Sequence, residues 1–122
     1  MKKVFLRVYF RDDSWIGPGK VQLLEAIQET GSISAAARVM DMSYRRAWLL
    51  IDGLNELFDT PAVSTTLGGR GGGTAALTPF GLDIVKRYRA MHAAAEHAIA
   101  RDAAVLARHV RPAPRRASSS KR

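Results

Sequence analysis

The run from Gly31 to Asn55, GSISAAARVMDMSYRRAWLLIDGLN, constrains the fold of this chain more than any other segment. Ser32 stands where it would cap a helix, and the alanines at 35–37 keep that helix thin enough for another to cross it closely. Asp41 to Ser43 then interrupts the pattern, and Ser43 is placed to cap a second helix. Two short helices joined in this way form a helix-turn-helix, whose second helix enters the major groove of DNA.

The second helix is predicted to have one buried and one exposed face. Steps of four and three residues predict a buried stripe of Ala47, Ile51 and Leu54. The start of the helix and its outer face carry the residues that we expect to contact DNA: Ser43, Tyr44, Arg45, Arg46 and Trp48. Ser32, at the start of the preceding helix, is added to this set.

Arg45 and Arg46 allow two interpretations. Arginines near a helix start are usually solvated, and the positive end of the helix dipole disfavours them there. A phosphate or a guanine at the helix N-terminus would reverse that penalty. We therefore favour DNA contact over a solvated role for these two side chains.

A glycine-rich turn follows the second helix. The segments AVSTTL and TAAL are typical of short strands, and GGRGGG between them predicts the tip of a hairpin, the wing of a winged helix. Gly69 and Gly71 would let the backbone lie close to a phosphate backbone or a narrow minor groove, with Arg70 supplying the attraction. A nucleotide cradle is disfavoured because no Gly-Lys-Ser/Thr triplet follows. A flexible hairpin with a solvated Arg70 stays open as the alternative.

Three segments before the helix-turn-helix complete the expected domain. Val4 to Phe10 alternates as a half-buried strand does, with Val4, Leu6, Val8 and Phe10 on one face. Residues 12–19 are expected to form a loop. A helix is predicted from Lys20 to Thr30, with Gly31 just past its end.

Thr78 and Pro79 predict the start of a last helix, which nothing interrupts before about Val110. At about 1.5 Å per residue it would reach on the order of 45 Å, so we expect it to pack on a second copy of the chain. Asp102 falls in the predicted seam and is costly there unless it is paired or near an end. Folding back on its own domain, or fraying beyond Ala95, are the alternatives. The coiled-coil-like seam comprises Ile84, Tyr88, Met91, Ala95, Ala98, Ile99 and Val105.

Charge and length agree with a DNA-binding domain. A chain of 122 residues holds one compact domain, and its 19 Lys+Arg against 11 Asp+Glu give a formal charge of +8. Five of the basic residues lie in the last twelve, RPAPRRASSSKR, which leaves +3 for residues 1–110. This tail is expected to be disordered, either adding nonspecific attraction to phosphate or serving only to solubilise.

Several other functions are disfavoured by what the sequence lacks. It has no cysteine, and His92, His97 and His109 do not align on one helix face, so no metal site is expected. We expect no catalytic constellation, and hence no enzyme, and no cofactor. Arg7 interrupts the apolar run near the N-terminus, and no segment approaches the roughly 20 apolar residues that span a bilayer. We expect a cytoplasmic protein without a membrane partner.

Three motifs together resemble a known family: IGPGKVQLLEAIQETGSISAAARVM, SYRRAW and LGGRGGGTAALTPFG. They are similar to the N-terminal domain of ModE-type molybdate-responsive transcriptional regulators, a winged helix related to the LysR-type DNA-binding domain. The resemblance covers about residues 3–100. It implies that Ser43 to Trp48 lie on the recognition helix, Gly69 to Gly73 on the wing, and Thr78 onward on the dimer helix. Regulation of molybdate transport or molybdenum-enzyme genes is implied by the resemblance alone.

Full-length members of that family carry C-terminal oxyanion-binding domains, whereas this sequence ends in the basic tail. We expect either constitutive DNA binding or a signal from a separate effector or sensor protein. The fold class expected is mainly α with a small β-hairpin, as a winged helix-turn-helix (1–78), a long dimerisation helix (79–110) and a tail (111–122). The function expected is a homodimeric, sequence-specific regulator that binds double-stranded DNA. A protein-interaction module facing an acidic partner, and a sensor with a pocket at the dimer interface, are the alternatives.

Overall fold

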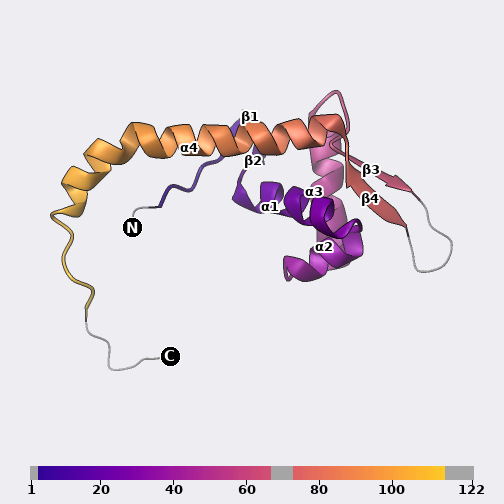
Figure 1. The fold of residues 1–122 in the computed structure, drawn as a ribbon, viewed down its shortest axis with the longest axis horizontal. Helices are drawn as coiled ribbons and strands as arrows, with labels where there is room; N and C mark the ends of the chain where they lie inside the picture. Colours follow the sequence, from indigo (N-terminus) through magenta and orange to yellow (C-terminus); the bar gives the residue numbers. More distant parts are fainter. Residues whose placement is uncertain (1–2, 67–72, 115–122) are drawn as a thin grey trace.

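The computed structural model describes residues 3–66 and 73–114, and it is mainly helical with two small antiparallel hairpins (Figure 1). This confirms the fold class predicted from the sequence. The hairpins are formed by β1 with β2 and by β3 with β4. In chain order the elements are β1 (Val8–Arg11), β2 (Ser14–Ile16), α1 (Pro18–Thr30), α2 (Ile33–Val39), α3 (Tyr44–Leu57), β3 (Val63–Thr66), β4 (Thr74–Leu77) and α4 (Pro79–Ala107).

The core lies where α1, α2 and α3 meet, with β4 and the start of α4 packed against α1. Ala36 and Ala37 of α2 are buried, as expected for a helix that another crosses closely. In α3 the buried residues are the predicted stripe, Ala47, Ile51 and Leu54. The periodicity of the helix-turn-helix therefore predicted its inner surface correctly. The largest contribution comes from α1, which buries Val21, Leu23, Leu24, Ala26 and Ile27.

Three hydroxyl groups cap the helices that the sequence predicted. The backbone N–H of Ala35 donates to Ser32 Oγ over 3.0 Å, and that of Arg46 donates to Ser43 Oγ over 3.0 Å. At the start of α4, the backbone N–H of Gly81 donates to Thr78 Oγ1. Gly31 ends α1 at a φ of 80°, a left-handed conformation that favours glycine. These local signals set the helix boundaries to within two or three residues.

The N-terminal segment differs from its prediction. The strand is only Val8–Arg11, and it pairs with β2, which lies in the segment expected to be a loop. Residues 3–7 instead run beside α4, where the hydroxyl of Tyr88 donates to the Leu6 carbonyl over 2.8 Å. His92 Nε2 lies 2.9 Å from the Val4 carbonyl, so His92 is half-buried at a contact and not free on the helix surface. The segment before Val8 therefore contacts α4 and does not continue the predicted strand.

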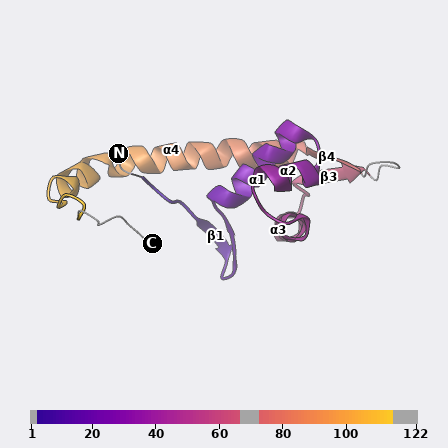
Figure 2. The ribbon, with the colours of Figure 1, turned by 90° about the horizontal axis from the view of Figure 1, so that it is seen from below.

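The last helix belongs partly to the domain core. Gly81 lies against the Ala62 carbonyl so closely that a Cβ there would collide with it. Ile84 and Tyr88 are 5% and 1% exposed in the single chain. The prediction that they face a second copy is therefore corrected, because their side chains are buried within their own domain. This burial also raises the pKa of Tyr88. Beyond Tyr88 no residue of α4 is buried, and the helix runs out past the other elements (Figures 1 and 2).

Candidate nucleic-acid interface

The start of α3 carries exposed cations. Arg45 and Arg46 are exposed, and no acidic residue lies in the first turn of the helix. Among the described residues the ion pairs join other partners: Arg87 with Asp83, Arg89 with Glu25, and His92 with Glu96. Two guanidinium groups at the positive end of a helix, without a carboxylate partner in the described chain, form a surface suited to an anionic ligand.

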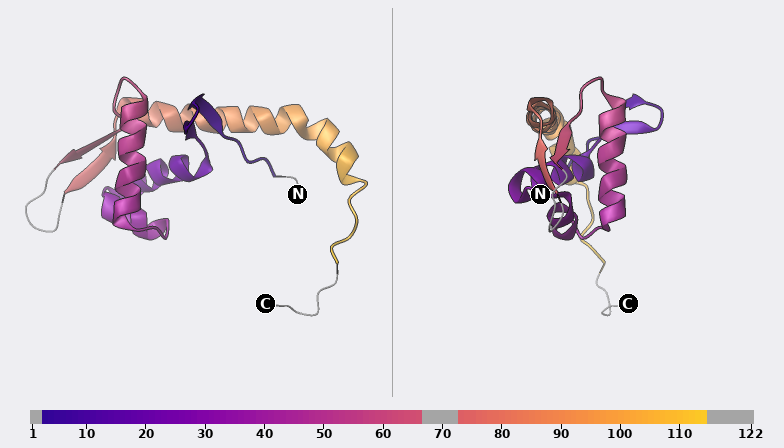
Figure 3. Two further views of the ribbon diagram at one scale, coloured as in Figure 1. Left: turned by 180° about the vertical axis from the view of Figure 1, so that it is seen from behind. Right: turned by 90° about the vertical axis from the view of Figure 1, so that its right-hand side faces the viewer.

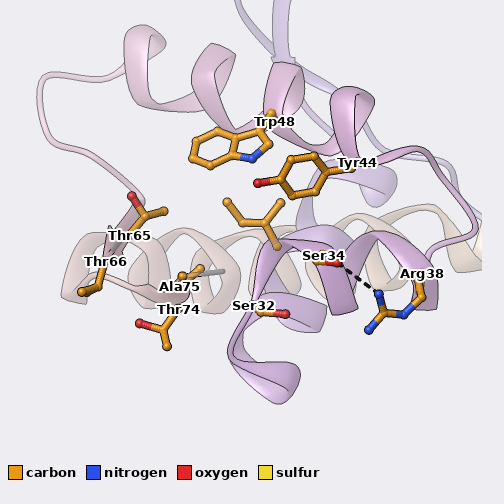
Figure 4. Close-up of a pocket in the computed structure, with 11 residues that line it drawn as sticks. Ser32, Ser34, Arg38, Tyr44, Trp48, Thr65, Thr66, Thr74 and Ala75 are labelled. Carbon is orange, nitrogen blue, oxygen red and sulfur yellow. Dashed lines mark hydrogen bonds between the residues drawn. The ribbon is translucent and has the colours of Figure 1, made fainter. Parts of the chain in front are cut away.

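Beside this helix start lies a hollow between α2, α3 and the second hairpin, with a cavity volume of about 570 Å³ (Figure 4). Tyr44 and Trp48 of α3 form one side of it, with their ring centroids 6.3 Å apart and their planes nearly perpendicular. Most of the remaining lining groups are polar. The lining residues are Ser32, Ile33, Ser34, Arg38, Tyr44, Trp48, Thr65, Thr66, Gly73, Thr74 and Ala75.

One cation of the hollow comes from α2. Arg38 donates from its guanidinium to Ser34 Oγ over 3.1 Å, one helical turn away, and Figure 4 shows this pair at the edge of the hollow. Threonines 65, 66 and 74 approach from the hairpin on another side. Hydroxyls, an arginine and two aromatic rings are the groups that proteins use on phosphate and sugar.

The second hairpin is held to the helices by specific hydrogen bonds. Asn55, near the end of α3, accepts at Oδ1 from the backbone N–H of Ala62 over 2.7 Å and from that of Val63 over 3.3 Å. The N–H of Ala75 in β4 donates to the Gly31 carbonyl over 2.8 Å. Within the hairpin, Val63 pairs with Leu77 and Thr66 with Thr74. Figure 3 shows the hairpin projecting from the helices on the side opposite to the long end of α4.

The predicted site residues divide into three groups. Tyr44 and Trp48 line the hollow, and Arg45 and Arg46 are exposed beside it. Ser32 and Ser43 use their hydroxyls as helix caps, although Ser32 also lines the hollow. The predicted wing residues Gly69, Arg70 and Gly71 lie outside the described residues.

Sequence reasoning included Ser32 but missed the other polar residues that α2 and the hairpin contribute to this surface. The spacing of Ser34 and Arg38 by four residues was a usable signal, because such residues face the same side of a helix. Threonines 65, 66 and 74 gave no comparable signal beyond their preference for strands. Their place beside α3 depends on how the hairpin is anchored.

The exposed part of α4 keeps an apolar character. Met91, Ile99 and Val105 are 38%, 44% and 42% exposed, and Ala98 is also exposed. Ala95 is half-buried, and Asp102 is exposed in the single chain. These residues of the predicted seam are therefore on the surface of the protomer, unlike Ile84 and Tyr88.

Residues 3–66 and 73–114 contain no cluster of three or more His, Cys, Asp or Glu side chains that would hold a metal ion. No helix among them has the length and apolar character required to cross a bilayer.

Comparison with known proteins places the helix-turn-helix in a family. Residues 19–82 match the bacterial regulatory helix-turn-helix proteins of the lysR family. The matched segment begins in α1 and ends in the first turn of α4, so it includes the helix-turn-helix and the second hairpin.

Individual relatives are similar over the same part. The molybdenum-pterin-binding protein MopB of Rhodobacter capsulatus is 43% identical over 83 residues, which are 68% of this chain and 31% of that protein. The molybdenum transport protein ModE of Azotobacter vinelandii is 47% identical over 72 residues, 59% of this chain and 27% of that protein. The DNA-binding transcriptional dual regulator ModE of Escherichia coli K12 is 33% identical over 86 residues, 70% of this chain and 33% of that protein. The chain thus spans about a third of the length of these relatives.

Proposed function

Because the chain belongs to the lysR family of bacterial regulatory helix-turn-helix proteins, we propose that it is a homodimeric transcriptional regulator that binds specific sites on double-stranded DNA. The observation that carries the proposal is the start of α3. Its two arginines have no acidic partner in the described chain, and it lies beside a hollow lined with hydroxyls and aromatic rings.

The proposal assigns some residues to the base edges of DNA and others to its sugar–phosphate backbone. With α3 in the major groove, Arg45 and Arg46 bind guanine or phosphate, and Tyr44 and Trp48 contact base edges and sugar. The hollow takes the adjacent sugar–phosphate backbone, with Arg38 supplying a positive charge. Arg70, in the segment between β3 and β4, is assigned to the backbone or the minor groove.

The homodimer is proposed from the exposed part of α4. A helix that leaves its domain with Met91, Ile99 and Val105 on its surface has apolar side chains for a second copy to cover. Two copies related by a two-fold axis would read two half-sites of a pseudo-palindrome, spaced by whole turns of DNA.

The class of regulated genes is proposed from the names of the relatives. Two of the three relatives described above carry the name ModE, and the names of two refer to molybdenum. We therefore assign this chain to regulation of molybdenum-related genes. A separate effector or sensor protein is the proposed source of any signal.

The proposal is tested by selecting fragments of sheared genomic DNA with the purified protein, over a salt series and with and without molybdate. We expect enrichment of a palindromic site. The double variant Arg45→Ala/Arg46→Ala should lose the preference for that site by at least tenfold, since one good base contact is worth about 1–3 kcal/mol.

Arg108→Ala/Arg111→Ala is the matched control, because it removes the same charge near the far end of α4. It should keep the site preference and differ from wild type only in the salt dependence of binding. Equal binding of all fragments by wild type and the α3 variant would overturn the proposal, and would favour a protein-interaction module instead.

A further inference from the structure

The outer face of α3 carries an apolar side chain that the described fold leaves uncovered. Leu49 is 60% exposed, whereas Leu50, the next residue, is half-buried against the core. Leu49 lies two residues from Ala47 and two from Ile51, which places it on the side opposite to the buried stripe. An exposed leucine alone is common on protein surfaces. Its position one turn after Arg45, on the face that points away from the core, makes it informative.

Gly53, one further turn along the same face, is a second unexplained residue. Glycine is a poor residue for a helix interior, yet Gly53 lies inside α3. Gly31 is explained by its positive φ, and Gly81 by its approach to Ala62. At Gly53 a Cβ would meet nothing within 4 Å in the described chain, and φ is not positive. The fold therefore does not require glycine at this position.

The geometry points to a reading role for both residues: Leu49 contacts the C5-methyl group of a thymine, and Gly53 lets the second half of α3 approach the groove closely. This inference rests on the proposed function, and it adds which base is read and by which residues. The thymine methyl is the apolar group that base pairs present in the major groove, and a leucine side chain complements it. At the start of this face Arg45 lies one turn from Leu49, and DNA offers a negative charge for the guanidinium and an apolar methyl group for the leucine. Further along, the exposed carboxylates of Asp52 and Glu56 suit a base edge that donates a hydrogen bond and not a phosphate.

The test of Leu49 uses the site obtained by genomic selection. Each thymine of one half-site is replaced in turn by deoxyuridine, which lacks only the methyl group. For wild type we expect one position at which the substitution weakens binding about fourfold, which corresponds to the free energy of burying one methyl group. Leu49→Ala should bind the unmodified site more weakly and show no further loss at that position. Its response at the other thymines should equal that of wild type.

Gly53→Ala tests the close approach with a change of one methyl group. Binding to the selected site should weaken about tenfold, while the thermal midpoint does not fall, because the free protein has space for the Cβ. Gly19→Ala is the matched control. Gly19 lies in α1, and a Cβ there also meets nothing within 4 Å, so this variant should bind DNA as wild type does.

The failure of this inference differs from the failure of the proposed function. If Leu49→Ala keeps every effect of deoxyuridine, or if Gly53→Ala binds as tightly as wild type, the reading role is wrong although site-specific binding stands. If wild type selects no site, the proposed function fails and this inference fails with it.

Discussion

Three glycines of this chain illustrate how differently one residue type acts at the scale of single residues. Gly31 adopts a left-handed conformation, Gly81 makes room for a neighbouring carbonyl, and Gly53 has open space around it. The sequence alone distinguishes only the first, because Gly31 follows a helix with the expected periodicity. The other two require knowledge of what lies beside the helix.

Gly81→Ala should destabilise the domain strongly. The added Cβ would collide with the backbone carbonyl of Ala62, and backbone cannot move aside as a flexible side chain can. We expect a loss of about 2–4 kcal/mol in the free energy of unfolding, the range of overpacked cores and strained backbone. Denaturant unfolding measures it. Gly19→Ala, where space is open, should change the same quantity by less than about 1 kcal/mol; equal stability of the two variants would show that α4 shifts freely away from Ala62.

Residue patterns predicted what depends on neighbours in the chain. The caps Ser32, Ser43 and Thr78 and the buried stripe of α3 follow from spacing within one helix, and all were confirmed. Arg38 and the wing threonines were missed, because their place at the hollow depends on how α2 and the hairpin pack. Tyr88 was assigned to the wrong partner, since a periodic apolar face does not reveal whether its own domain or a second copy covers it.

At the scale of elements, Asn55 sets the position of the second hairpin relative to α3. Its side chain accepts from Ala62 N–H and Val63 N–H, and its Nδ2 group lies 3.4 Å from the Val63 carbonyl. Asn55 lies six residues after Leu49 and two after Gly53, on a different side of the helix. A single amide therefore connects the proposed reading helix to the start of the hairpin.

Asn55→Ala should lower the free energy of unfolding by about 1–3 kcal/mol, because it leaves two partly buried N–H groups without their acceptor. It should also weaken binding to the selected DNA site at temperatures where the domain stays folded, as the hairpin loses its anchor. Asn55→Asp keeps the acceptor oxygen and is the control. Unchanged DNA affinity for the folded alanine variant would show that the hairpin is positioned without Asn55.

At the scale of the whole molecule, α4 joins two tasks in one element. Its first turns contribute Gly81, Ile84 and Tyr88 to the core, and its later turns expose Met91 and Ile99. The sequence predicted one continuous helix correctly but treated it as a separate dimerisation element. The structure shows a helix whose first turns belong to the domain core and whose later turns are exposed.

Ile99→Asp should convert the proposed dimer to monomer. A carboxylate placed in an apolar seam without a partner costs several kcal/mol, so we expect dimerisation to weaken by at least about 100-fold. Sedimentation over a concentration series measures it, and binding to a single half-site should persist while cooperative binding to two is lost. Ala100→Asp adds the same charge outside the predicted seam, about 100° around α4 from Ile99, and should remain dimeric. Identical sedimentation of both variants and wild type would rule out this face as the interface.

Because α4 begins inside the core to which α3 also contributes, the two helices belong to one packed domain. If two copies cross along α4, the position of the crossing point sets the distance between the two α3 helices of the dimer. Shifting the crossing point by one helical turn moves each α3 by about 5.4 Å, compared with about 3.4 Å for each base pair of DNA. Changes in the seam would therefore retune the spacing of target sites, while α3 keeps reading the same bases.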